Sequence, residues 1–516
     1  MIQQIDYFVI APPLALAAVA GLVLLLDAVL PATTRTRTGL GLVTLAGVLV
    51  ALGFVVAQAV SGVPRSTFCV PPDLAADGQG ALCSFVADRF TLAFAGLVLV
   101  AALVVVLMSM TELAGGGIPV GEWYFLLLCT LVGAVTLPAS RDLIMLVVAL
   151  ELVSLPVFAL TALKRYDGRA SEAAVKLFVV SVVSTAIMLF GVSLLYGISG
   201  TVYLSRLAAV VSGRVPAPGV AAGTYSTALE TAHGLPGVVT VGVVLVAAGF
   251  AFKVAAVPFH SWAADVYQGA PIPVAALLSV ISKAAGFAGL ILVLVTALAG
   301  QSSSWGPVIA IVSALTMTVG NLLAMRQRSA VRMLAWSSVA QSGYVLAPLA
   351  VAATVADPQA ATGTSIAYLV IYAAMNLGAF AVVMLVSRTA ARNELDDYRG
   401  LALRNPAAGI ALAFCLVCLA GLPPGLAGLF AKVFVFREIV EGGLGWLALV
   451  MAVNTVIGLY YYAAWTARLF TPSGGKALHR PAPAAWLAIG LALAVAILFS
   501  VAPQLVLDMT SLSATG

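Results

Sequence analysis

The stretch FKVAAVPFHSWAADVYQGAPIPVAALLSVISKAAGF, residues 252–287, decides how this chain folds. It places Lys253 and Lys283 inside runs that are otherwise apolar, with Pro258 between them. Proline removes a backbone donor and clashes with the preceding turn, so a helix through this stretch should kink or open. Lysine at the centre of a membrane helix costs about 2.5 to 3.5 kcal/mol on insertion scales, so two such residues are unusual. The stretch therefore predicts membrane helices that bury charge around a break.

The composition of the whole chain is that of an integral membrane protein. Of its 516 residues, 62% are hydrophobic and only 9% are charged, which excludes a soluble domain of ordinary surface polarity. Apolar runs of about 17 to 25 residues, long enough to cross a bilayer as helices, follow one another almost end to end. These runs are continuously apolar rather than alternating, which favours helices over a membrane β-barrel, and no strand is evident. The fourteen predicted spans are approximately 6–30, 39–60, 90–111, 122–138, 142–163, 174–197, 237–257, 272–298, 305–325, 330–353, 363–387, 406–436, 443–468 and 482–505.

Basic residues are distributed unevenly between the two alternate sets of loops. Fifteen lie in one set and five in the other, so the positive-inside rule places the first set in the cytoplasm and both termini outside. The first run has no positive N-terminal region and no small-residue cleavage site, so we expect it to be retained as a span. The charges are scattered over loops, which gives no indication of a nucleic-acid partner. The cytoplasmic set is Arg35, Arg37, Lys164, Arg165, Arg169, Arg326, Arg328, Arg332, Arg388, Arg392, Arg399, Arg404, Arg468, Lys476 and Arg480, and the outer set is Arg65, Arg89, Arg141, Arg206 and Arg214.

The sequence holds no pattern for a resident cofactor or metal. No glycine-rich phosphate loop follows a strand, so the chain is not expected to hold NAD in a Rossmann fold. The three histidines and five cysteines show no metal-ligand spacing. Cys69 and Cys83 both fall in the predicted outer loop, from about 61 to 89, which is an oxidising location. There they either pair as a disulfide or remain free thiols.

Charged residues inside the predicted spans carry the functional argument. Glu151, in the string ALELVSLPVF, lies near the middle of the fifth span, too deep to reach either interface. Lys253, Lys283 and Lys432 lie in the seventh, eighth and twelfth spans. Intramembrane charges of this kind mark a charge pathway by default. Lys176 sits near the start of the sixth span, where a lysine stem can also extend to the headgroups.

Two of the predicted spans are interrupted by proline. The seventh meets Pro258 and the twelfth meets Pro423 and Pro424, and irregular backbone at membrane depth is tolerated only beside protein or water. The breaks lie five spans apart and each has a lysine nearby, which predicts two repeated five-helix units, spans 4–8 and 9–13. Simple proline kinks in a bundle are the alternative. The single membrane domain, 1–516, would then consist of N-terminal helices (1–121), a first half (122–298), a second half (305–468) and a last helix (482–505).

The natural use of these charges is a proton relay. A carboxylate that approaches or leaves a buried amine changes the affinity of that amine for a proton. Movement of Glu151 relative to a lysine could therefore load or release a proton. Each unit charge moved across 100 mV costs about 2.3 kcal/mol, which an ion gradient or an attached energy-converting subunit must supply. The sequence shows no energy-converting domain of its own.

Three strings resemble one known family. ELVSLP at 151–156, the stretch 252–287 and GLPPGLAGLFAKVFVF at 421–436 resemble subunit N of the proton-pumping NADH:quinone oxidoreductase, respiratory complex I, one of its antiporter-like membrane subunits. The resemblance covers essentially the whole chain and includes the fourteen spans and the broken seventh and twelfth helices. It implies an all-α polytopic subunit without a redox centre. Such a subunit couples electron transfer from NADH to quinone, carried out in other subunits, to proton translocation.

The resemblance also implies roles for single residues. Glu151 matches the family's fifth-helix glutamate, the partner of the first-half lysine, here Lys253. Lys176 matches a sixth-helix lysine, Lys283 the lysine that connects the two half-channels, and Lys432 the twelfth-helix lysine that faces the outer side. The expected helix breaks are Pro258, Pro423 and Pro424, with His260 as a structural or gating residue, and the polar side chains that could support waters are Ser282, Ser337, Ser338, Gln341, Ser342 and Tyr344.

The implied cofactors and partners lie in other chains. FMN, iron–sulfur clusters, NADH and quinone would be bound by other subunits, and the partners would include the antiporter-like subunit M, small membrane subunits and the lipid bilayer. The bias toward alanine, valine, glycine and arginine suggests a high-GC bacterium, hence its inner (plasma) membrane, with menaquinone as a candidate quinone. Two alternatives of other classes stay open. One is a subunit of a multisubunit sodium/proton antiporter, and the other is a scaffold that conducts nothing.

Overall fold

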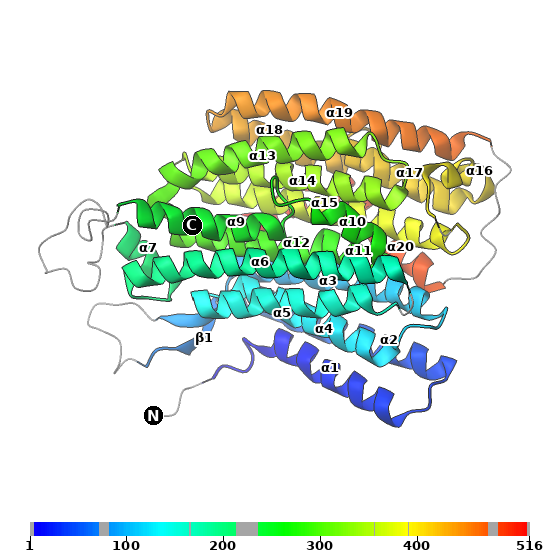
Figure 1. The fold of residues 1–516 in the computed structure, drawn as a ribbon, viewed down its shortest axis with the longest axis horizontal. Coiled ribbons are helices and arrows are strands. Elements are labelled where there is room, and N and C mark those ends of the chain that lie inside the picture. Colours follow the sequence, from blue (N-terminus) through cyan, green and yellow to red (C-terminus); the bar gives the residue numbers. More distant parts are fainter. Residues whose placement is uncertain are drawn as a thin grey trace, which may run out of the picture.

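The chain folds into one bundle of helices that run along a common direction (Figure 1). This fold is that of a computed structural model, which describes residues 5–71, 82–164, 167–212, 236–355, 357–390, 392–472 and 483–512. Within those ranges, 11 helices are long and apolar enough to cross a membrane. The chain is therefore a multi-pass membrane protein. Four of the basic residues used above for orientation, Arg165, Arg214, Lys476 and Arg480, lie outside the described residues.

Every predicted span coincides with a helix, which confirms the all-α polytopic class. Spans one to seven correspond to α1 (Ala11–Val29), α2 (Thr34–Ser61), α3 (Arg89–Leu113), α4 (Val120–Thr136), α5 (Leu143–Ala162), α6 (Gly168–Ser199) and α9 (Pro236–Lys253). Spans nine to eleven are α13 (Ser302–Ala324), α14 (Ala330–Ala352) and α15 (Gln359–Ser387), and the last two are α19 (Gly445–Phe470) and α20 (Pro483–Val501). Short helices join them, among them η2 (Leu137–Ala139), α7 (Leu204–Val211), η5 (Ala299–Gln301), η6 (Leu395–Tyr398), α16 (Leu401–Arg404) and α21 (Pro503–Thr510).

The seventh span is broken where the sequence predicts. Helix α9 ends at Lys253, and α10 (Trp262–Gly269) begins after a turn that contains the cis bond between Val257 and Pro258. Backbone groups freed by the break find partners, as buried polar groups must. The Val257 N–H donates to Thr316 Oγ1 over 3.0 Å, and the Trp262 indole donates to the Phe252 carbonyl over 3.2 Å.

The twelfth span is broken as well. Helix α17 (Pro406–Ala420) ends in a left-handed Gly421, with φ of 82°, and α18 (Leu426–Glu441) begins after the cis bond between Pro423 and Pro424. A Cβ on Gly421 would lie 3.1 Å from Lys432 Cδ, so both the backbone conformation and the close approach of Lys432 favour glycine here.

The eighth span is more irregular than its apolar sequence predicts. It consists of α11 (Ile272–Leu277), η3 (Leu278–Ser282), α12 (Lys283–Ile291) and η4 (Leu292–Ala297), and η3 and η4 are π-helical. Short π segments inside α-helices are frequent at functional sites, and η3 ends directly before Lys283. This span and α15 are each 94% buried across their apolar windows, so they form the centre of the bundle.

The expectation that the chain has no strand is wrong. The loop between α2 and α3 contains β1 (Arg65–Cys69) and β2 (Cys83–Ala87), an antiparallel pair whose ends are joined by a disulfide between Cys69 and Cys83. Each strand is only five residues long, and of the two only β2 alternates in burial, so neither stands out among apolar runs of membrane length. Phe85 is buried against Val9 and Ala139, which fixes the hairpin to the bundle. β1 and α7 lie at one end of the bundle and α16 lies at the other (Figure 1).

Candidate functional site

Lys253 lies at the C-terminal end of α9 and is buried, with 7% of its surface exposed. Its ammonium donates a hydrogen bond to the hydroxyl of Ser154, on α5. Glu151 is one turn earlier on α5, half-buried, and accepts a hydrogen bond from the Thr185 hydroxyl of α6 over 2.7 Å. Among the described residues, no ion pair within 4.0 Å joins Glu151 to Lys253. A hydroxyl, rather than the Glu151 carboxylate, is thus in contact with the Lys253 ammonium, and Glu151 lies one turn from that hydroxyl on α5.

A small cavity links Lys253 to the next span. Lys253, Ser154 and Ser282 line it, and its volume is about 10 Å³, close to the minimum that holds one water. Ser282 is the residue directly before Lys283, so this cavity points from one buried lysine toward the other. A water there would have at least three polar partners, which is the number that buried waters usually find.

Lys283 is enclosed by α14. The exposed fraction of Lys283 is 1%, and its ammonium donates to the Ser338 carbonyl and, over 2.8 Å, to the Ser342 hydroxyl. The Ser342 hydroxyl in turn donates to the Val254 carbonyl over 2.7 Å. Val254 directly follows Lys253, so the broken seventh span, α14 and the eighth span meet at one hydroxyl. All partners of Lys283 among the described residues are neutral, which leaves its positive charge without an adjacent counter-charge.

A polar stripe on α15 continues from this point. Tyr368, Tyr372 and Asn376 are four residues apart, so they share one face of the helix. Tyr372 donates to the Ser338 hydroxyl over 2.8 Å, and Asn376 donates to the Ser279 hydroxyl over 2.8 Å. The spacing of four is present in the sequence, but none of these residues was among the predicted site residues.

The stripe leads toward Lys432. Tyr368 donates to Gln341 Oε1 over 2.6 Å, and its ring stacks on Tyr344 with centroids 5.9 Å apart. The Lys432 ammonium lies 5.7 Å from the centroid of the Tyr344 ring, within cation–π range. Beside them, Ser337 is hydrogen-bonded to the Tyr462 hydroxyl. The predicted polar residues of α14 therefore lie together and extend toward the third lysine.

Lys432 is held by the break itself. It lies on α18, is 7% exposed, and donates to the carbonyls of Leu419 and Ala420 over 3.1 and 2.8 Å. These carbonyls end α17, where the last turn of a helix leaves acceptors unused and carries partial negative charge. The break after α17 thus provides the acceptors that a buried ammonium needs.

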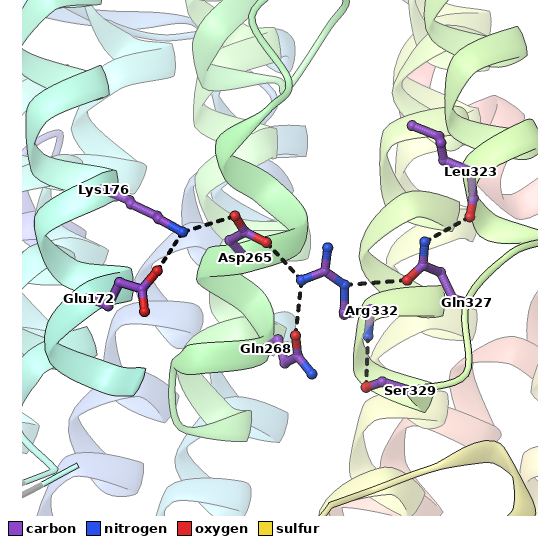
Figure 2. Close-up of polar contacts among 8 residues, drawn as sticks. All are labelled: Glu172, Lys176, Asp265, Gln268, Leu323, Gln327, Ser329 and Arg332. Carbon is purple, nitrogen blue, oxygen red and sulfur yellow. Dashed lines mark hydrogen bonds and ion pairs between the residues drawn. The ribbon is translucent and has the colours of Figure 1, made fainter. Parts of the chain in front are cut away.

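Lys176 is not part of this buried row. It is 43% exposed and pairs with Glu172 over 2.6 Å and with Asp265 over 3.1 Å. The second carboxylate oxygen of Asp265 accepts from Arg332 over 2.7 Å, and Arg332 also contacts Gln268 over 2.9 Å. Figure 2 shows Asp265 between the two cations, with α6 on one side and α14 on the other. Asp265 lies inside the stretch 252–287 but was not among the predicted site residues.

His260 lies in the turn between α9 and α10. Its ring packs edge-on against Trp336 of α14 with centroids 5.6 Å apart, and its Nδ1 is buried without a hydrogen-bond partner among the described residues. In the part of the chain that the structure describes, no group of three histidine, cysteine, aspartate or glutamate side chains could hold a metal ion.

The chain is similar to several known proteins over nearly its full length. Residues 140–458 match the family model described as NADH:quinone oxidoreductase/Mrp antiporter, TM. The chain is 47% identical to NADH-quinone oxidoreductase subunit N 2 of Streptomyces griseus, over 99% of this chain and 94% of that protein. A chain of respiratory complex I from Thermus thermophilus has a TM-score of 0.73 at 28% identity, covering 96% of this chain and 98% of that one.

A chain of the Mrp complex from a Dietzia species has a TM-score of 0.76 at 21% identity, covering 97% of this chain and 96% of that one. At that identity the likeness shows the shared fold alone. The full-length identity to the NADH-quinone oxidoreductase subunit N 2 is more than twice as high. The residues matched by the family model include both helix breaks and the four lysines of the predicted relay, Lys176, Lys253, Lys283 and Lys432. This chain therefore belongs to the NADH-quinone oxidoreductase subunit N family of antiporter-like membrane subunits.

Proposed function

We propose that this chain is a proton-translocating subunit of an NADH:quinone oxidoreductase and has no redox centre of its own. The observation that carries the proposal is the row of three buried lysines, joined through Ser342 and the polar stripe of α14 and α15. Each lysine contacts only neutral groups among the described residues. An ammonium buried in this way is sensitive to any charge that approaches it, because little else compensates it.

The proposed relay alternates the protonation of neighbouring lysines. A proton on Lys253 disfavours one on Lys283, since like charges in a poorly screened interior repel. Glu151, held by Thr185 one turn from the Ser154 contact, favours the proton on Lys253 when the carboxylate approaches it. The proton would then pass to Lys432 through hydroxyl and amide side chains and the waters that they support. These side chains are those of Ser282, Ser338, Gln341 and Ser342.

The remaining assignments belong to the same proposal. We place Lys176 at the cytoplasmic end of the first half (122–298), Lys432 toward the outer end of the second half (305–468), and both termini outside the bacterial inner membrane. The partners would be other membrane subunits of the complex, including subunit M. FMN, iron–sulfur clusters, NADH and quinone, with menaquinone as a candidate, would bind those other subunits and supply the driving electron transfer.

Purification of the tagged full chain in mild detergent tests the proposal. We expect flavin, iron–sulfur absorbance and NADH:quinone activity to accompany the chain, and proton uptake into vesicles on addition of NADH. An intact assembly without these groups, which exchanges sodium for protons without NADH, would show instead that the chain serves an antiporter. Full pumping by an assembled complex that lacks the buried lysines would leave the chain only a scaffold role.

A further inference from the structure

A second pocket lies beside the Lys176–Asp265–Arg332 bridge and gathers arginines. It has a volume of about 530 Å³, within the range of about 300 to 1,000 Å³ typical of small-molecule sites. Five guanidinium groups line it, from three segments that are distant in the sequence. The lining arginines are Arg169 at the start of α6, Arg326 and Arg328 after α13, Arg332 on α14, and Arg392 before η6.

The positive charge of this pocket is poorly balanced. Glu394 is its single acidic lining residue, and the Glu394 carboxylate caps η6 by accepting from the backbone N–H of Asp397. Of the five arginines, only Arg332 forms an ion pair with a described carboxylate, that of Asp265. The positive-inside rule accounts for arginines in cytoplasmic loops but not for their convergence on one pocket. A bound anion would account for it.

The floor of the pocket is held rigidly. Ser329 caps α14, and its neighbour Arg328 accepts at its carbonyl from the N–H of Leu395 over 2.7 Å. Arg332 is oriented by Asp265 and Gln268 through Nη1 and by Gln327 through Nε, which leaves Nη2 pointing away from these partners (Figure 2). Nη2 therefore keeps N–H groups that can form a charge-assisted hydrogen bond to an anion. The N-terminus of α14 adds partial positive charge at the same place.

Apolar side chains are exposed on the two helices that begin or end beside pocket arginines. Arg169 begins α6, and Phe178 and Val182 further along that helix are 50% and 46% exposed. Arg326 follows α13, on which Leu322 and Leu315 are 43% and 46% exposed. A ligand with an anionic head and apolar tails would match both features, whereas a free anion would use only the first.

We propose that this arginine pocket binds the phosphodiester headgroup of an anionic phospholipid, with its acyl chains along α6 and α13. Basic pockets between membrane helices on the cytoplasmic side are a general mode of recognition for such headgroups. Because Arg332 also holds the Asp265 bridge through Nη1, a headgroup bound at Nη2 would place a second anion on the same guanidinium. Lipid binding would then change how firmly α14 is tied to α10.

Photolabelling of the intact complex tests the proposal. The complex is reconstituted in phosphatidylcholine vesicles with a phosphatidylglycerol that carries a photoreactive headgroup, and labelled peptides are mapped by mass spectrometry. We expect labelling around Arg326 and Arg392. Labelling should fall by roughly tenfold in the Arg326→Gln/Arg392→Gln variant, because each guanidinium contributes severalfold to binding of an anionic headgroup. The matched control, Arg35→Gln/Arg37→Gln, removes two arginines of the first turn of α2, outside the pocket, and should keep full labelling.

Two results would overturn the proposal. Equal labelling of the pocket variant and the unaltered complex would show that these arginines do not recognise the headgroup, as would equal labelling by a photoreactive phosphatidylcholine. Loss of labelling in millimolar inorganic phosphate would show that the pocket prefers a free anion over a lipid. Persistence of labelling in phosphate, together with its loss in the pocket variant, supports the lipid assignment.

Discussion

The hydroxyl of Ser342, on α14, donates a hydrogen bond over 2.7 Å to the carbonyl of Val254, the residue that directly follows Lys253. The same hydroxyl accepts from Lys283 over 2.8 Å. One side chain of the second half thus contacts the helix break of the first half and the central lysine at once. A change in the protonation of Lys283, or in the position of the backbone beside Lys253, can therefore affect the other site through the Ser342 hydroxyl.

Ser342→Ala removes this contact without adding volume. We expect coupled quinone reduction to fall about tenfold, because loss of a hydrogen bond to a charged group is worth about 1.5 kcal/mol or more. The measurement is the NADH:quinone rate and proton uptake of the assembled complex. Ser193→Ala is the matched control, since Ser193 is exposed and its hydroxyl donates to the carbonyl of Leu189 within its own helix. Unchanged pumping in Ser342→Ala would remove this hydroxyl from the relay.

Glu151→Gln tests the proposed carboxylate. Glutamine keeps an acceptor for the Thr185 hydroxyl but removes the charge, so assembly should be normal while pumping and the coupled rate fall together. Thr185→Val should also lower pumping and the coupled rate, but by less, because the Glu151 carboxylate remains. Glu441→Gln is the control, since Glu441 is 59% exposed and pairs with Arg437 at the surface. A fully coupled Glu151→Gln complex would refute the role of the carboxylate.

Asp265→Asn should affect function more than stability. Its ion pairs to Lys176 and Arg332 involve groups that are 29 to 43% exposed, and such pairs contribute about 1 kcal/mol or less. The bridge nevertheless ties α6 to α14, so we expect a clear loss of pumping with little change in melting temperature. Lys176→Met and Asp265→Asn should be non-additive, as expected of residues in contact. Additive losses of pumping in the double variant would mean that the two act separately.

Tyr368→Phe probes the segment between Lys283 and Lys432. It preserves the ring that stacks on Tyr344 but leaves Gln341 Oε1 without the hydroxyl donor. An unsatisfied buried acceptor costs about 1 to 3 kcal/mol, so we expect a severalfold slower coupled rate in a complex that still assembles. Tyr196→Phe serves as the control, because Tyr196 is 51% exposed on α6. Equal activity of the two variants would exclude Tyr368 from the route.

Much of the fold could be predicted because membrane length and proline chemistry are local signals. The fourteen spans and both breaks follow from apolar runs and from Pro258, Pro423 and Pro424. The β1–β2 hairpin was missed because its strands are only five residues long, and the π-helical turns before and after α12 leave no trace in hydropathy. A hydropathy pattern indicates which segments are long and apolar enough for a membrane helix. The hairpin and the π-helical turns depend instead on how the segments pack against the rest of the bundle.

The site was predictable only in part, for a similar reason. The buried lysines and the serines of α14 stand out as polar residues in apolar runs. The Asp265 bridge joins residues 89 and 67 positions away in the sequence, and no periodicity encodes such a pairing. Glu151 was predicted as the partner of Lys253, and the sequence did not indicate that Ser154 would bond to Lys253 and Thr185 to Glu151.

The most direct test of the account is the number of protons moved per NADH oxidised in the assembled Lys283→Met complex. Methionine keeps most of the volume of lysine but cannot carry a proton, and Lys164→Met, at a lysine that is 50% exposed, is the matched control. The account predicts normal assembly and flavin content, a normal ratio for Lys164→Met, and a lower ratio with slower NADH oxidation for Lys283→Met. A Lys283→Met complex that pumps at the normal ratio and rate would contradict it.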